Sequence, residues 1–187
     1  SAIIIGNGTT RQYQQELNGK MLENFAANAW TNTMNTYQAN SRGTAAPRVN
    51  IINSNTSNTG KENLQQVRFG LGSALLEDGY FSYDHGDQNH GQTWWYDEYD
   101  VALGEPLSPS LAANTQGSYQ PDIWRRDFEH GLVLVNSTNQ AKTVDLGGEY
   151  EKINGKQASS VNDGAIVSEV DIEGTDGIIL RKTVSRL

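Results

Sequence analysis

The chain has 187 residues, a formal net charge of -8 at pH 7 and no Cys. This length is below the roughly 200–250 residues of a complete (β/α)8 barrel, so we expect one domain or slightly more. Without Cys the chain has no disulfides or Cys nucleophile, and its 14 Lys and Arg are too scattered to bind nucleic acid. Three His and no long apolar run lead us to expect no metal, no other cofactor and no membrane partner.

The first part of the chain alternates between short strand-like runs and segments with helical features. Three of the runs are rich in β-branched or aromatic residues, and the second is weaker by propensity. The predicted strands are residues 2–7, 19–24, 48–53 and 79–84, and the predicted helices are residues 11–17, 28–38 and 61–77. Strands that alternate with helices are typical of βα units, so this part predicts a parallel sheet.

The two longer helices are predicted from apolar residues that share one face. In the first, Trp30, Met34 and Tyr37 follow the helical spacing i, i+4, i+7. In the second, an apolar stripe is interrupted by Gly70 and Gly72. We interpret these glycines as positions where the helix lies close against a sheet.

A long segment without periodicity, residues 85–122, follows the last predicted strand of the first part. A loop of this length in a compact domain is usually functional or a linker. The apolar pattern then alternates at every second residue. We therefore divide the chain into an α/β domain, residues 1–122, and an all-β domain, residues 123–187.

The all-β domain is predicted as an antiparallel β-sandwich of at least five strands. Gly147–Gly148 and Asn154–Gly155 are predicted turns, the second a strong hairpin signal. The predicted strands are residues 131–136, 142–146, 149–153, 165–172 and 177–180.

Five sequence blocks resemble the C-terminal half of glycoside-hydrolase-like (β/α)8-barrel families that carry a C-terminal β-sandwich. The blocks are LNGKMLENF at 17–25, RFGL at 68–71, ALLEDGYFSYD at 74–84, WWYDEYDVALG at 94–104 and WRRDFEHGLVLVN at 124–136. Such families are predicted polysaccharide-degrading proteins. The resemblance implies that the four strands of the first domain are strands five to eight of a barrel, so that about four βα units form half of it.

Half a barrel has two unpaired sheet edges, and unpaired edges favour association. We therefore expect either a partner or a chain that is one piece of a longer protein. The partner would be a second copy in a homodimer or a chain that carries the missing N-terminal half-barrel. The isolated chain is expected to have little activity, because one catalytic carboxylate would be missing from it.

Two carboxylates are candidate catalytic residues, because catalytic groups of a barrel lie at the C-terminal ends of its strands. Glu23 follows the second predicted strand and Asp84 the fourth. Glycoside hydrolysis uses a pair of carboxyl groups, one of them protonated, and apolar neighbours of Glu23 in the sequence favour its protonated form. The resemblance implies that Glu23 is the general acid/base and that the nucleophile belongs to the absent half. Alternatively, Glu23 stabilises a helix N-terminus, and Asp84 binds a sugar hydroxyl or forms a turn.

The centre of the long loop is a candidate wall for sugar binding, because flat aromatic rings cover the apolar faces of sugars and polar neighbours bind the hydroxyls. An alternative is that the rings fill the junction between the two domains while the acidic residues remain solvated. The acidic spacing does not match a calcium-binding EF-hand loop. The predicted substrate-binding residues are Trp94, Trp95, Tyr96, Asp97, Glu98 and Tyr99.

The sequence therefore predicts a C-terminal fragment of a glycoside hydrolase that acts on a polysaccharide or oligosaccharide. The alternative is a non-catalytic carbohydrate-binding or structural domain that associates through the exposed barrel edges. In either case carbohydrate is the expected ligand. An extracellular or periplasmic location is expected, because polysaccharides are found there.

Overall fold

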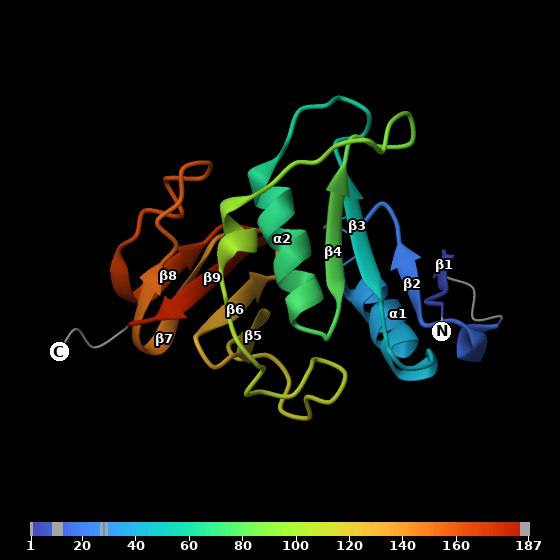
Figure 1. The fold of residues 1–187 in the computed structure, drawn as a ribbon. Coiled ribbons are helices and arrows are strands. Elements are labelled where there is room, and N and C mark those ends of the chain that lie inside the picture. The colour runs from blue at the N-terminus through green and yellow to red at the C-terminus, as the bar shows by residue number, and fades with distance from the viewer. Residues whose placement is uncertain (1, 9–12, 27, 29, 184–187) are drawn as a thin grey trace.

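The computed structural model describes residues 2–8, 13–26, 28 and 30–183 (Figure 1). Its first part is a four-stranded sheet in the order β1-β2-β3-β4, and every pair of neighbouring strands is parallel. The strands are β1 (Ile5–Asn7), β2 (Gly19–Leu22), β3 (Ile51–Asn55) and β4 (Tyr80–Asp84). The predicted parallel sheet is confirmed, with each predicted strand at its expected place in the chain.

Two α-helices connect these strands: α1 (Trp30–Gly43) links β2 to β3, and α2 (Leu64–Leu75) links β3 to β4. Asn63 caps α2 by accepting hydrogen bonds from two backbone N–H groups of its first turn. Part of the short helix predicted at residues 11–17 lies outside the described residues. The described remainder holds one 3-10 turn, η1 (Gln14–Glu16), rather than an α-helix.

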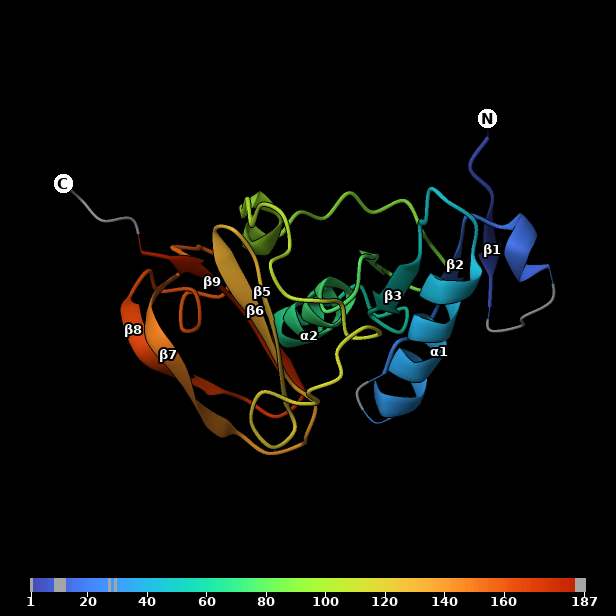
Figure 2. The same ribbon diagram turned by 90° about the horizontal axis from the view of Figure 1, so that it is seen from below.

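The second part is a five-stranded antiparallel sheet in the order β5-β6-β9-β7-β8. The sandwich predicted for this region would need two facing sheets, whereas the described strands form one sheet that curls (Figure 2). One face of the curled sheet encloses a core of its own, with Leu134 and Val144 among its members. The strands are β5 (Ile123–Asp127), β6 (Gly131–Asn136), β7 (Lys142–Lys152), β8 (Ile166–Ile172) and β9 (Asp176–Lys182).

The turn predicted at Gly147–Gly148 is wrong, because β7 continues through both glycines as one strand. Its pairing with β8 shifts register between Asp145 and Tyr150, and Gly147 has a φ of 71°. The glycine pair therefore allows an irregularity within a strand rather than a reversal of the chain. The reversal comes later, in a β7–β8 loop whose ends are held by an isolated bridge between Asn154 and Asp163.

Helix α2 lies between the two sheets and joins them (Figures 1 and 2). A Cβ atom at Gly70 would collide with the ring of Phe81 in β4, and one at Gly72 would lie 2.9 Å from a methyl group of Val135 in β6. The predicted close approach at the two glycines is therefore confirmed. One glycine allows contact with each sheet.

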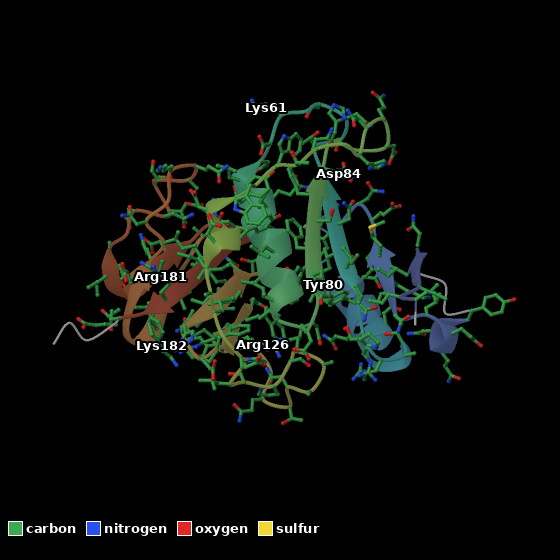
Figure 3. The ribbon with its side chains drawn as sticks, viewed as in Figure 1. Lys61, Tyr80, Asp84, Arg126, Arg181 and Lys182 are labelled. Carbon is green, nitrogen blue, oxygen red and sulfur yellow. The ribbon has the colours of Figure 1, made fainter. Side chains whose placement is uncertain are left out.

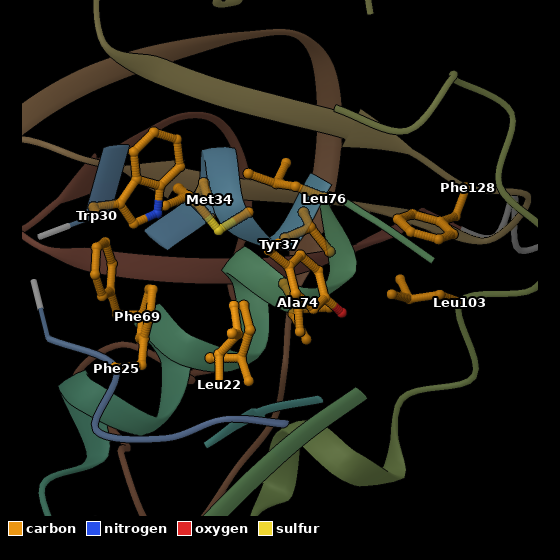
Figure 4. Packing of buried hydrophobic residues seen from close by; sticks show 14 of the residues in the cluster. Leu22, Phe25, Trp30, Met34, Tyr37, Phe69, Ala74, Leu76, Leu103 and Phe128 are labelled. Carbon is orange, nitrogen blue, oxygen red and sulfur yellow. The ribbon is translucent and has the colours of Figure 1, made fainter. Parts of the chain in front are cut away.

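A single hydrophobic core spans both parts of the chain (Figure 4). The predicted face of α1 is buried in it, and the indole rings of Trp30 and Trp124 lie 5.6 Å apart between centroids. Arg126 of β5 is 4% exposed and donates to the carbonyl of Leu75 at the end of α2 and to Asp78. The change from parallel to antiparallel pairing falls before β5, close to the predicted division at residues 122 and 123.

The parallel sheet is covered by helices on one face only (Figure 2). Side chains alternate along β4, so Phe81 and Tyr83 turn toward α2 while Tyr80, which is 55% exposed, and Asp84 turn the other way. Within the described residues, no strand pairs with the outer edge of β1 or β4. The same part of the chain contains no helix that is both long and apolar enough to span a membrane.

Candidate functional site

Asp84 is the last residue of β4 and lies at the carboxyl edge of the parallel sheet (Figure 3). Its Oδ2 atom is 3.0 Å from Nδ1 of His90 and accepts a hydrogen bond of 3.3 Å from the amide of Asn53. Its Oδ1 atom is buried and has no hydrogen-bond partner among the described residues. A buried carboxylate oxygen without a partner is costly, so this atom is a natural acceptor for a ligand hydroxyl.

Strand register brings Asn53 to Asp84. The pairing of β3 with β4 aligns Asn53 with Ser82 and Asn55 with Asp84. The amide of Asn53, which is 5% exposed, also donates to the hydroxyl of Ser82 at 3.4 Å. Asn53 therefore fixes the carboxylate of Asp84 from the neighbouring strand.

Glu23 follows β2 at the same edge, and its side chain is exposed. The apolar surroundings expected for it are absent, because Leu22 and Phe25 on either side are buried in the core. Helix α1 is described from Trp30, seven residues after Glu23, so the alternative role at a helix N-terminus stays a prediction. Between Glu23 and the helix, Asn24 adopts a φ of 55° and accepts a 2.8 Å hydrogen bond from Asn55.

Electrostatics connect Glu23 with the pair formed by Asp84 and His90. The hydrogen bond that the imidazole of His90 donates to Asp84 raises the pKa of His90, and the negative charges of Asp84, Asp87 and Glu23 raise it further. These residues come from the segment that follows β2, from β4 and from the loop that follows β4. The carboxyl edge thus combines three carboxylates, a titratable imidazole and several amides.

The aromatic residues after this edge divide into buried and exposed rings. Tyr96 is 1% exposed and packs against Tyr83 and Tyr99, with ring centroids 6.1 and 5.3 Å away. Burial raises the pKa of Tyr96, and it raises the pKa of Tyr99 to about 12. Trp94 lies 5.9 Å from Tyr83 and is half-buried. The buried rings therefore fill a junction against α2 and β4.

Trp95 differs from its neighbours because 63% of it is exposed. Its ring packs edge-on against Tyr99 with centroids 5.5 Å apart, and its indole N–H donates to Asp100 at 3.0 Å. The ring is thus held in one orientation while much of it faces solvent. Among the predicted aromatic residues, Trp95 is the one best placed to cover a sugar ring.

The carboxylates of Asp97 and Glu98, in η3 (Asp97–Asp100), contact the chain itself. Asp97 accepts backbone hydrogen bonds from Lys156 and Gln157 at 2.6 and 2.8 Å. Glu98 is buried and accepts a 2.8 Å hydrogen bond from Asn162. Both residues attach η3 to the β7–β8 loop. In the described part of the chain, no three His, Asp or Glu side chains gather as a metal site.

Sequence reasoning placed Asp84 and Glu23 at the correct edge but missed His90 and the amides of Asn24 and Asn55. Their signal is modest: His90 is one of three His, and it follows Asp84 by six residues. Asn is common throughout this chain, so the sequence alone does not distinguish the asparagines of the edge.

A parallel sheet with helical connections and polar side chains at its carboxyl edge defines an α/β protein with a site in the position typical of such folds. The sequence profile of the hypothetical glycosyl hydrolase family 15 matches residues 1–132. The chain belongs to this family, which agrees with the glycoside-hydrolase-like resemblance of its sequence blocks. In a comparison with curated proteins, none matches the chain.

Proposed function

We propose that the chain is part of a glycoside hydrolase that acts on a polysaccharide or oligosaccharide, and that its parallel sheet is half of a (β/α)8 barrel. The family match supports the class of enzyme. The observation that supports the proposal is the buried Oδ1 atom of Asp84 at the carboxyl edge, for which the described part of the chain offers no hydrogen-bond partner. This is the edge at which barrel enzymes hold their catalytic groups.

Glu23 is the proposed general acid/base. In this role it protonates the glycosidic oxygen as the bond to the anomeric carbon breaks and a nucleophilic carboxylate, expected on the other half-barrel, bonds to that carbon. It then takes a proton from the water that displaces this carboxylate and completes hydrolysis. Its exposure allows a substrate to reach it, and closure of the site by a second half-barrel would supply the desolvation that favours its protonated form.

Asp84 is proposed as a second carboxylate or as the acceptor for a sugar hydroxyl. His90 and Asn53 hold one of its oxygens and leave the other for substrate. Carboxyl groups about 5–5.5 Å apart retain the anomeric configuration, and a separation of roughly 6.5–9.5 Å inverts it. Trp95, which is held by Tyr99 and Asp100, is proposed as the sugar-stacking residue.

The test is the release of reducing sugar from a panel of plant and bacterial polysaccharides by the native gene product. Glu23→Gln is expected to lower turnover at least about a hundredfold, the usual contribution of general acid–base catalysis. Asp84→Asn is expected to lower it as well, through loss of charge with the shape of the side chain kept. Glu16→Gln is the matched control, because Glu16 is exposed on η1 at the other end of the sheet. Unchanged turnover in folded Glu23→Gln protein would remove Glu23 from the mechanism.

A second candidate function is a non-catalytic carbohydrate-binding or structural domain that associates through the barrel edges. It is favoured by exposed apolar residues at the two outer strands of the parallel sheet: Ile3, Ile4 and Ile5 in and just before β1, and Tyr80 in β4. In this case the folded chain binds oligosaccharide. A mixture of the chain with its partner then shows no hydrolysis that depends on Glu23. Both proposals include a partner, either a separate half-barrel or a second copy of the chain. Both also include an extracellular or periplasmic location.

A further inference from the structure

A polar cavity lies on the antiparallel part of the molecule, far from the carboxyl edge. It has a volume of about 560 Å³ and is formed by the loop that precedes β5 together with β5 and β7. That loop lies at the end of the molecule where Figure 3 labels Arg126, opposite the end that carries Asp84. A volume of this size is within the range of small-ligand sites.

Arg125 forms the fixed base of the cavity. Its guanidinium binds Asp127 with a shortest contact of 2.7 Å, and it donates to the carbonyl of Leu146 at 2.8 Å. It also lies over the rings of Tyr119 and Tyr150, 4.7 and 5.7 Å from their centroids. With these partners the guanidinium is held in one position before any ligand arrives, which lowers the entropy cost of binding.

Tyr119 supplies an aromatic surface. Its ring stacks on Arg125, its hydroxyl donates to the carbonyl of Asp145 at 2.9 Å, and the residue is 41% exposed while lining the cavity. A ring that is fixed at its hydroxyl and on one face presents the rest of its surface to a ligand. Flat, oriented rings of this kind cover apolar C–H faces at low entropy cost.

The polar groups of the cavity select a neutral ligand with several hydroxyls. The charge of Arg125 is balanced by Asp127, whose side chain is 34% exposed and accepts a 3.2 Å hydrogen bond from Ser108. This carboxylate repels anions such as phosphate and accepts hydrogen bonds from hydroxyl groups. The remaining lining is rich in amide and hydroxyl side chains, including Asn114 and Gln116, which disfavour a purely apolar ligand.

We propose that this cavity is a sugar-binding subsite, separate from the catalytic edge, in which a neutral sugar unit stacks on Tyr119 and donates hydroxyl hydrogen bonds to Asp127. The choice of carbohydrate as ligand rests on the proposed function. The position of the site does not, because it follows from the cavity and its fixed side chains. A subsite here would hold a polysaccharide chain while the carboxyl edge acts on another part of it.

The test is the binding of xylohexaose, cellohexaose and maltohexaose to the folded protein, followed by calorimetry and by amide shifts in NMR spectra. We expect saturable binding of at least one probe, with shifts at Gly117 and Gly147, which line the cavity. Tyr119→Ala is expected to raise Kd about tenfold through loss of stacking. Tyr119→Phe keeps the ring and loses only the hydrogen bond to Asp145, so its Kd should rise much less than that of Tyr119→Ala. Asp127→Asn is expected to weaken binding through a poorer hydroxyl acceptor.

Several results would overturn the subsite: no saturable binding of any probe, an unchanged Kd in folded Tyr119→Ala protein, or shifts confined to the surroundings of Trp95. Displacement of the sugar by millimolar inorganic phosphate would also overturn it, by showing an anion site. The two proposals fail separately. If Glu23→Gln loses hydrolysis while Tyr119→Ala binds sugar as the wild type does, only the subsite proposal is wrong. If Glu23→Gln keeps hydrolysis while Tyr119→Ala loses binding, only the catalytic role of Glu23 is wrong.

Discussion

His90 is the residue whose charge reports most directly on the carboxyl edge. Its hydrogen bond to Asp84, aided by the charges of Asp84, Asp87 and Glu23, raises its pKa above 6.5. A pKa raised by folding stabilises the native state fully at pH values below the unfolded pKa, and this stabilisation is lost as the pH rises through the folded pKa. We therefore expect an NMR titration of His90 with a midpoint above the ordinary value for histidine, and a lower midpoint in Asp84→Asn, in which the charges of Asp87 and Glu23 remain.

Asp87→Asn is the comparison for this titration, because Asp87 acts on His90 through its charge alone while Asp84 also accepts a hydrogen bond. It should lower the midpoint by less than Asp84→Asn does. Equal shifts in the two variants would show that the contact between Asp84 and His90 does not persist in solution.

Two neighbouring aromatic residues just before η3 have opposite surroundings, since Trp95 is 63% exposed and Tyr96 is 1% exposed. Trp95→Ala is expected to weaken oligosaccharide binding roughly fivefold to tenfold, through loss of ring stacking. Its melting temperature should stay close to that of the wild type. Tyr96→Ala, by contrast, should cost about 3–5 kcal/mol of stability in urea unfolding, because it empties a buried site.

If Trp95→Ala bound oligosaccharide with unaltered affinity, Trp95 would have no role in sugar recognition. The sequence did not separate these two residues because a run of aromatic and acidic residues has no period that marks one face as buried. The sequence likewise did not show that Asp97 and Glu98 accept hydrogen bonds from the β7–β8 loop, because their partners are about sixty residues further along the chain.

At the scale of elements, α2 depends on small residues where it meets the antiparallel sheet. A Cβ atom at Gly177 of β9 would lie 2.6 Å from the carbonyl oxygen of Arg68 and 3.3 Å from that of Leu134. Both neighbours are backbone atoms, so the helix and the sheet would have to move apart. Gly177→Ala is expected to cost about 1–3 kcal/mol in the free energy of unfolding, the usual range for overpacking.

Gly148→Ala is the matched control for this prediction. Gly148 also lies in a strand of the same sheet, but a Cβ atom at this position would have its nearest neighbour 3.8 Å away. The change should be neutral or slightly stabilising, because Ala restricts the unfolded chain more than Gly does. A Gly177→Ala protein as stable as Gly148→Ala would contradict the close contact of α2 with β9.

The elements that could be predicted are those whose pattern is local. Strands of the parallel sheet and the apolar faces of α1 and α2 follow from periodicity over a few residues, as Trp30, Met34 and Tyr37 illustrate. The continuity of β7 through Gly147 could not be predicted, because a glycine pair allows either a turn or a bulge. Pairing with β8 and β9 decides between them, and pairing partners are not visible in local sequence.

At the scale of the whole molecule, the parallel sheet is unusual in having one face without helices, since all-parallel sheets are normally covered on both faces. Its outer strands β1 and β4 also lack neighbours within the described residues. Two such sheets, each contributing four parallel strands, would supply the eight strands of a closed barrel and remove both pairs of edges. This geometry favours association of the chain with a second half.

We therefore predict that the chain forms dimers through the edges of its parallel sheet, measured by sedimentation equilibrium. Ile4→Lys and Tyr80→Lys, at 53% and 55% exposed positions beside the two edges, should shift the protein to the monomer, because they place a charge where the strands of two copies would meet. Ile166→Lys is the matched control, an exposed residue of β8 in the other sheet, and should leave the dimer unchanged. A monomer in the wild type would exclude pairing of identical halves and leave a separate N-terminal half-barrel as the proposed partner. Dissociation by Ile166→Lys alone would place the interface on the antiparallel sheet.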